Sequence, residues 1–307
     1  MNNKQVRSTI AIIVTVIIWG FSFLSIKVTI NVLPPMTLAL LRFIMASFVL
    51  AVVFKRKEPE TKLKKNDIPT MIWGGIFGVS LYFYFENNSI KYISASAASI
   101  LVATIPVITI LAEAIFLRNP MNGRKSISVL LSILGVYYVV GGNFTELLTS
   151  GTGMGYGMML GAVFAWVAYT IITKPLFEKY SQLAIVYYQT VFGTAALFPF
   201  VFLEKTPWHL VSGSIILNVL YLGIFCSALA YYLYAFSMDA LGVTVTSVYL
   251  NLIPVVTVIA SFIILKEKIH LNQVFGGMLV IAAVTLANWQ KVQKHEIVNQ
   301  DTAACIK

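Results

Sequence analysis

Long runs of apolar residues alternate with short polar segments along this 307-residue chain. A helix needs about 20 mainly apolar residues to cross the roughly 30 Å hydrocarbon layer of a bilayer. Ten runs approach or exceed this length, so the pattern predicts ten membrane-spanning helices. The ten predicted spans are residues 9–29, 36–54, 68–89, 93–117, 126–141, 153–173, 183–203, 213–236, 243–265 and 272–289.

The composition supports the same class of protein. Hydrophobic residues make up 58% of the chain and charged residues only 11%, whereas a soluble protein of this size needs more charge on its surface. We therefore expect an all-α integral membrane protein. The net charge of +10 does not indicate a nucleic-acid partner, because the basic residues lie in short loops between spans. The histidines and cysteines share no metal-ligand or disulfide spacing, so we expect no metal site and no cofactor.

The loop charges predict the orientation in the membrane. With the N-terminus inside, the inner segments hold 16 basic residues and the outer loops hold 4. This asymmetry places both termini in the cytoplasm and the protein in the cytoplasmic membrane. The first apolar run follows Lys4 and Arg7, as in a signal peptide. We expect it to be retained in the protein, because a copy of it returns downstream.

That copy belongs to an internal repeat of the whole chain. The stretch WGFSFLSIK, from Trp19 to Lys27, has its counterpart in WVAYTIITK, from Trp166 to Lys174, at an offset of 147. Two further pairs lie at an offset of 148: Gly75-Ile76-Phe77 with Gly223-Ile224-Phe225, and Ile105-Pro106-Val107 with Ile253-Pro254-Val255. Because each unit contains an odd number of spans, the second unit must be inverted in the membrane, as in many secondary transporters.

The repeat divides the chain into two five-helix units. The expected boundaries are 1–142 for the first repeat, 143–152 for an outer connecting loop, 153–290 for the second repeat and 291–307 for a cytoplasmic tail.

These residues resemble the EamA-type transporters of the drug/metabolite transporter superfamily. The resemblance rests on the Trp19-Gly20 pair followed by Lys27, on Arg42, on the run from Tyr92 to Ser99, and on the Ile-Pro-Val motif in mid-helix. It implies ten helices, with the first four of each half around a central cavity and the fifth bracing them. It also implies movement of small metabolites, commonly outward. The chain departs from the family where Leu-Gly-Glu is usual. It reads Leu117-Arg118-Asn119 in the first half and Leu265-Lys266-Glu267 in the second.

Ionisable residues inside the spans are the first candidates for function, because a charge in hydrocarbon costs several kcal/mol and rarely persists without a use. The predicted directions of the spans place Lys27, Arg42 and Glu86 at similar depth in the outer part of the membrane. They can form a structural ion pair with a snorkelling lysine, or they can gate the cavity or couple transport. In the second half Lys174 lies at the inner side, and Gln189 and Tyr234 stand in place of the other two.

The prolines and aromatics of the spans are candidates for the cavity wall. Pro106 and Pro254 lie near the centres of the fourth and ninth predicted spans, where each frees a carbonyl four residues earlier. Such carbonyls at the midplane face protein or a wet cavity, so either a packing kink or a shared central site explains them. The remaining candidates are polar or aromatic, and each can equally be a packing residue: Trp19, Ser22, Tyr82, Tyr84, Asn87, Thr104, Trp166, Tyr169, Tyr231, Tyr232 and Asn251.

Two glycine ladders indicate close helix packing. The first is Gly153, Gly157 and Gly161 in the sixth span, and the second is Gly74 with Gly78 in the third.

Together these features favour a secondary transporter that exports amino acids or related amphiphilic compounds by alternating access. No nucleotide-binding motif is present in the sequence, so coupling to protons through Glu86 and uncoupled facilitation both stay open. Two other classes are an integral-membrane enzyme for lipids or quinones and a helix-bundle scaffold. The first needs acids, histidines or a metal set at one membrane face. A helix-bundle scaffold does not explain the repeat or the charges within the spans. The expected partners are a small-molecule substrate and the lipid bilayer, and the oligomeric state stays open.

Overall fold

The computed structural model describes the chain except residues 1–2, 117–120, 142–150, 242–245, 247–248 and 305–307. The described residues form helices and turns, without a strand among them. In the first half the elements are α1 (Asn3–Thr29), α2 (Pro35–Lys57), α3 (Ile68–Gly75), η2 (Ile76–Leu81), α4 (Tyr82–Tyr92), α5 (Ala95–Val102), α6 (Ile105–Phe116) and α7 (Gly123–Val140).

The second half repeats this order. Its elements are α9 (Gly151–Thr173), η3 (Lys174–Glu178), α10 (Gln182–Val201), α11 (Gly213–Leu220), η5 (Tyr221–Leu229), α12 (Ala230–Leu241), α14 (Ile253–Ala260), η6 (Ser261–Leu265) and α15 (Leu271–Ala304). The backbone of α15 stays helical to Ala304, well beyond the predicted end of the tenth span at residue 289.

The prediction of an all-α membrane fold is confirmed. Within the described residues, 8 helical segments are long and apolar enough to cross a membrane. Two shorter apolar helices, Ile253–Leu265 and Leu271–Ala287, occupy the ninth and tenth predicted spans. The predicted start of the ninth span at 243 lies outside the described residues, as does most of the predicted connecting loop at 143–152.

The fourth predicted span is two helices, so the packing kink that Pro106 could have explained is not present. α5 ends at Val102 and α6 begins at Ile105, so Pro106 stands in the first turn of α6. Pro254 likewise lies at the start of α14. The first turn of a helix tolerates proline, because the N–H that proline lacks would have no helical acceptor there. Both prolines therefore begin a helix instead of kinking one.

Both copies of the Gly-Ile-Phe motif lie at π-helical turns. Ile76 and Phe77 belong to the π-helical segment η2, and Gly223-Ile224-Phe225 lies inside the π-helical segment η5. Such turns widen a helix locally and are frequent at functional sites. In η5 the carbonyl of Cys226 accepts a hydrogen bond from Trp19 Nε1 at 3.0 Å. The second-half π-helical segment is thereby tied to α1 of the first half.

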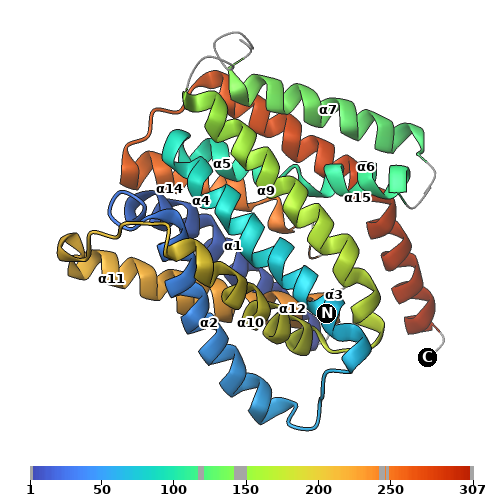
Figure 1. Cartoon of the computed structure of the whole chain (residues 1–307). Coiled ribbons are helices and arrows are strands. Elements are labelled where there is room, and N and C mark those ends of the chain that lie inside the picture. The colour runs from blue at the N-terminus through green and yellow to red at the C-terminus, as the bar shows by residue number, and fades with distance from the viewer. Residues whose placement is uncertain (1–2, 117–120, 142–150, 242–245, 247–248, 305–307) are drawn as a thin grey trace.

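Helices of one half pack mainly on helices of the other (Figure 1). α4 packs on α9, α2 on α10, and α1 on α12. The fifth helices of the two halves, α7 and α15, lie side by side along one edge of the molecule (Figure 1). The resemblance implied this bracing role for them. The three inner pairs leave the centre of the molecule to side chains from both halves.

Two of the helix crossings depend on facing glycines. A Cβ on Gly193 of α10 would lie 2.5 Å from the Gly75 carbonyl oxygen, and one on Gly276 of α15 would lie 2.5 Å from the Gly135 carbonyl oxygen. Only a residue without a Cβ fits such contacts.

The predicted ladder in α9 is only partly a packing surface. A Cβ on Gly161 would meet the Phe85 ring, whereas one on Gly157 would meet nothing within 4 Å. The glycine of this region that packs most tightly is Gly155, whose Cβ would lie 2.7 Å from that of Tyr92. The second ladder is confirmed as a packing surface, because Gly74 abuts Gln189 and Gly78 abuts the Tyr169 ring.

Candidate functional site

Aromatic rings from both halves meet at the centre of the bundle. Trp19 of α1 packs against Tyr231 and Tyr234 of α12, with ring centroids 5.4 and 5.5 Å apart. Trp166 of α9 lies 5.0 Å from the rings of both Tyr82 and Tyr169. Trp19, Tyr82, Trp166, Tyr169 and Tyr231 are thus predicted cavity residues that the structure brings together. We call these five residues and Tyr234 the central aromatic cluster.

A small cavity of about 20 Å³ lies beside this cluster. Trp166, Tyr169 and Tyr231 contribute to its wall, and the rest of the lining is Phe43, Gly74, Gly78, Val79, Val186, Gln189 and Thr190. A cavity of this size holds about one water molecule. A metabolite needs several times that volume, so the helices must move apart before one can enter.

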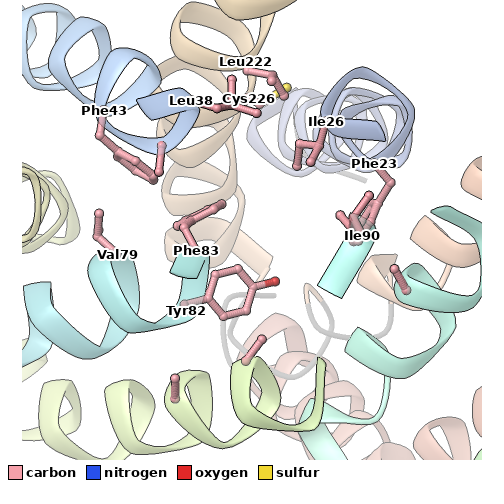
Figure 2. Close-up of a cluster of buried hydrophobic side chains, with 14 of the residues drawn as sticks. Phe23, Ile26, Leu38, Phe43, Val79, Tyr82, Phe83, Ile90, Leu222 and Cys226 are labelled. Atoms are coloured by element: carbon pink, nitrogen blue, oxygen red, sulfur yellow. The ribbon is translucent and has the colours of Figure 1, made fainter. Parts of the chain in front are cut away.

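Arg42 lies next to the cluster and is buried, with 3% of its surface exposed. Its Nε donates to Ser227 Oγ of η5 at 2.9 Å, and its guanidinium carbon lies 4.5 Å from the centre of the Phe83 ring. Figure 2 shows Phe83 facing Phe43 across the space between α2 and α4. Arg42 Nη1 is buried without a hydrogen-bond partner among the described residues. An unpaired, charged donor of this kind is costly.

Glu86 of α4 is the acid of this region and is 4% exposed. Its Oε1 accepts a hydrogen bond from Tyr82 at 2.8 Å. Arg42 acts on Glu86 electrostatically, but in the described part of the chain the two form no ion pair within 4.0 Å. The two side chains therefore interact only at a distance.

Gln189 of α10 occupies the position that corresponds to Arg42 in the second half. Its Nε2 donates to Thr173 Oγ1 at 3.0 Å, and its Oε1 is buried without a partner among the described residues. It lines the small cavity. The two corresponding positions of the repeat thus each hold a buried polar side chain with an unpaired hydrogen-bonding atom among the described residues.

Lys27 does not join Arg42 and Glu86, contrary to the expectation of one charged layer. Its Nζ donates to the carbonyl oxygens of Ile90 and Ile93 at 2.6 and 2.7 Å, at the C-terminal end of α4. Glu267, rather than Glu86, is the acid that acts on it electrostatically. A cation at the C-terminus of a helix stabilises the last carbonyls, so Lys27 holds the turn between α4 and α5. Lys174 is exposed in η3, at the end of α9.

The remaining predicted residues lie outside the central cluster. Tyr84 packs on Phe85 and Phe200, and Tyr232 contacts Lys57 at the other side of α12. Ser22 donates to the carbonyl of Trp19, and Thr104 donates to that of Leu101.

Asn87 lies within α4, whereas Asn251 and the two prolines lie at or next to the start of a helix. Asn87 donates to the carbonyl of Pro35 at 3.0 Å, which ties α4 to the start of α2. Asn251 is buried next to the start of α14, and its Nδ2 has no partner among the described residues. Neither proline lines the small cavity.

Sequence reasoning missed several residues around the centre. Phe43, Phe83, Thr190 and Ser227 belong to ordinary apolar spans, and nothing in their spacing distinguishes them. Gln189 was not among the candidate site residues, although the repeat aligns it with Arg42 and so points to its position.

Carboxylates from loops close the outer end of the molecule, as defined by the predicted orientation. Glu204 follows α10 and accepts from Met36 N and Thr37 N at 3.0 and 2.7 Å, at the start of α2. Glu267 follows η6 and accepts from Ala95 N at 2.9 Å, at the start of α5. The positive end of each helix dipole favours such an acid.

A second set of contacts joins the two halves at the predicted inner end. Glu58 follows α2 and accepts from Ser181 Oγ at 2.6 Å, at the start of α10. Asp67 binds Lys179 Nζ at 2.7 Å and Tyr180 OH at 2.8 Å. The bonded carboxylate raises the pKa of Lys179, so this ion pair persists at neutral pH.

The sequence model of the EamA-like transporter family matches the chain twice, over residues 7–141 and again over 153–289. The chain belongs to this family. Its membership makes it a multi-pass membrane protein of a transporter family. The departure from the family at Leu117-Arg118-Asn119 lies outside the described residues.

Relatives of this EamA-like chain carry transporter names. Two uncharacterized transporters of Archaeoglobus fulgidus are 29% and 30% identical to it, over 91% and 95% of this chain and 97% and 100% of theirs. A probable terminal-alkyne amino-acid exporter of Streptantibioticus cattleyicolor is 27% identical, over 93% of this chain and 94% of its own. A solved crystal structure shares the fold, with a TM-score of 0.63, 15% identity, and coverage of 91% of this chain and 97% of that one.

Proposed function

We propose that this protein is a secondary transporter that exports amino acids or related amphiphilic compounds across the cytoplasmic membrane by alternating access. The observation that carries the proposal is Arg42, buried beside the central aromatic cluster with Nη1 unpaired. A guanidinium presents donors in a planar fork that matches a carboxylate. A substrate carboxylate would supply the partner that Arg42 lacks.

The surroundings of Arg42 suit the rest of an amino acid. Glu86 and the unpaired Oε1 of Gln189 are acceptors for a substrate ammonium group. The rings of Trp19, Trp166 and Tyr231 offer an apolar wall for its side chain. One relative is named a probable amino-acid exporter, and this agrees with the chemistry of the site.

Alternating access requires a releasable contact at each end of the bundle, and the two ends provide such contacts. Glu204 follows α10 and holds the start of α2, while Glu58 follows α2 and bonds the N-cap Ser181 of α10. The two contacts are thus reciprocal, as an inverted repeat demands. We call Glu204 with Thr37 the outer latch. At the inner end Asp67 adds its contacts with Lys179 and Tyr180 to the Glu58 contact, and we call these three residues the inner latch. Release of one latch while the other holds would open the cavity to one side only.

Counterflow into vesicles tests this function. Purified protein is reconstituted, the vesicles are loaded with an unlabelled compound, and uptake of the labelled compound is followed. The panel contains apolar α-amino acids, the matched amines without a carboxylate, and the matched acids without an amino group. We expect counterflow for the amino acids, and little for the amines, because Arg42 then has no anion to bind.

Imposed gradients identify the energy source in the same vesicles. Acceleration by an inward or outward pH gradient would mark proton coupling, and indifference to the gradient would mark uncoupled transport. Protein-free vesicles and heat-inactivated protein are the controls. Absence of gradient-driven flux for every compound would refute the transporter, and flux of the amines alone would refute the amino-acid assignment.

A further inference from the structure

A groove of about 370 Å³ runs between α1 and α12, away from the central aromatic cluster. Its body is apolar, with Ile10 and Val14 of α1 on one side and Leu233 and Phe236 of α12 on the other. Ile10 and Val14 are 56% and 37% exposed, so this face is open to the hydrocarbon of the membrane. Such a groove suits an extended hydrocarbon chain.

Two cations border one end of the groove. Arg7 lines it directly. The ammonium of Lys57 bonds the hydroxyl of Tyr232, another lining residue, and lies 4.6 Å from the centre of its ring. Within the described part of the chain, neither cation has a carboxylate partner within 4.0 Å. Two cations that share one site and lack an internal counterion favour an anion from outside.

The charges and the apolar surface follow the polarity of a membrane leaflet. Arg7 near the start of α1 and Lys57 at the end of α2 belong to the same, predicted inner, end of the bundle. From Arg7 to Val14 the helix rises about 10 Å toward the membrane centre, at roughly 1.5 Å per residue. A ligand that fits both parts has an anionic head at the surface and a hydrocarbon tail below it.

We propose that this groove binds an anionic phospholipid of the inner leaflet. Its phosphate lies between Arg7 and Lys57, and one acyl chain lies along Ile10, Val14 and Phe236. Basic pockets at the cytoplasmic face of transmembrane helices recognise acidic headgroups in this way. The site is separate from the transport site, so it does not depend on the proposed substrate.

Native mass spectrometry of the full chain tests the site. The protein is reconstituted in nanodiscs with equal amounts of phosphatidylglycerol and phosphatidylcholine, then released, and its retained lipids are counted. We expect one phosphatidylglycerol to be retained in preference to phosphatidylcholine. Arg7→Gln should weaken this preference about fivefold and the pair Arg7→Gln with Lys57→Gln about 30-fold, since each surface cation contributes about equally.

Two further variants separate the parts of the site. Val14→Trp fills the apolar body and should abolish retention with both cations in place. Lys62→Gln with Arg124→Gln removes two exposed cations away from the groove and should leave retention unchanged. Equal retention of both lipids by the unaltered protein, or full retention by the double charge variant, would overturn the proposal. Displacement of the lipid by inorganic phosphate alone would show a site for soluble anions and would overturn it too.

Discussion

Arg42 is the buried charged residue on which the proposed substrate site depends. Its guanidinium is buried between helices, is held by Ser227 and lies over Phe83, yet one of its nitrogens has no partner among the described residues. Leaving a charged donor unpaired costs on the order of 1–3 kcal/mol or more. A charged residue within a membrane span marks a candidate functional site, and we propose that Arg42 binds an anionic group.

Substitution of Arg42 therefore tests the site at the residue scale. We expect Arg42→Gln to raise the KM for amino-acid transport about 10- to 100-fold, because a charged hydrogen bond is worth about 1.5–3 kcal/mol. Arg42→Lys should recover only part of this loss, since an ammonium lacks the planar fork. Initial rates in vesicles measure the effect.

The matched control is Arg124→Gln, which removes an exposed arginine at the start of α7. Its KM should equal that of the unaltered protein. If Arg42→Gln and Glu86→Gln both transport like the unaltered protein at every pH, the substrate binds elsewhere.

At the scale of elements, the helices are positioned by glycine contacts and by charged caps. α3 with η2 crosses α10 at Gly75 and Gly193, whose backbones touch because neither has a Cβ. The starts of α2 and α5 are bound by acids from the other half of the chain. The first kind of contact fixes where two helices meet, and the second fixes where a helix begins.

Gly193→Ala tests the first kind of contact. The new Cβ would lie 2.5 Å from both the Gly75 oxygen and the Val79 Cβ, so the helices must separate. Overpacking of this kind destabilises a protein by about 1–3 kcal/mol, and thermal unfolding in detergent should show a lowered midpoint.

Gly157→Ala is the matched control, because its Cβ would meet nothing within 4 Å. It should leave the midpoint unchanged or raise it slightly, as alanine favours a helix over glycine. A midpoint for Gly193→Ala equal to that of Gly157→Ala would show that α3 and α10 do not need this contact.

On the scale of the whole molecule, we propose that the two latches hold a closed state around a cavity that is too small for a metabolite. The outer latch joins the loop after α10 to the start of α2, and the inner latch joins Asp67 to the segment before α10. Since the latches lie at opposite ends, loss of one should shift the population toward opening at that end.

A single cysteine in the cavity wall measures this shift. Thr190 is replaced by cysteine, Cys226 and Cys305 are replaced by serine, and the rate of labelling at position 190 is followed. Glu204→Gln should increase labelling by a membrane-impermeant maleimide from the outside, and Asp67→Asn should increase it from the inside. A lost charged contact of about 1–2 kcal/mol corresponds to roughly a 5- to 30-fold change in the ratio of states.

The exposed acid Glu60 provides the control, since Glu60→Gln removes a charge without touching either latch. This variant should leave labelling unchanged from both sides. Equal labelling from both sides in Glu204→Gln and Asp67→Asn would contradict the assignment of the latches.

Much of this architecture follows from the sequence alone. The length and spacing of the apolar runs predict the spans, because hydrocarbon accepts only helices with every backbone group bonded. The offset between Trp19 and Trp166 predicts that the same unit occurs twice, and aligns Gln189 with Arg42. The cost of buried charge marks Arg42 and Glu86 before any contact is known.

Only the tertiary structure decided which of these residues meet. Lys27 has the depth of Arg42 in sequence, but the rotation of α1 directs its ammonium to the end of α4. Ser227 and Gly193 acquire their roles from helices more than a hundred residues away in the chain, and Phe83 acquires its role from Arg42 on another helix. Hydrophobic periodicity shows that a helix face is buried, but it does not show which helix covers that face. The partners of Arg42 and the contacts of the two latches are therefore known only from the packed helices.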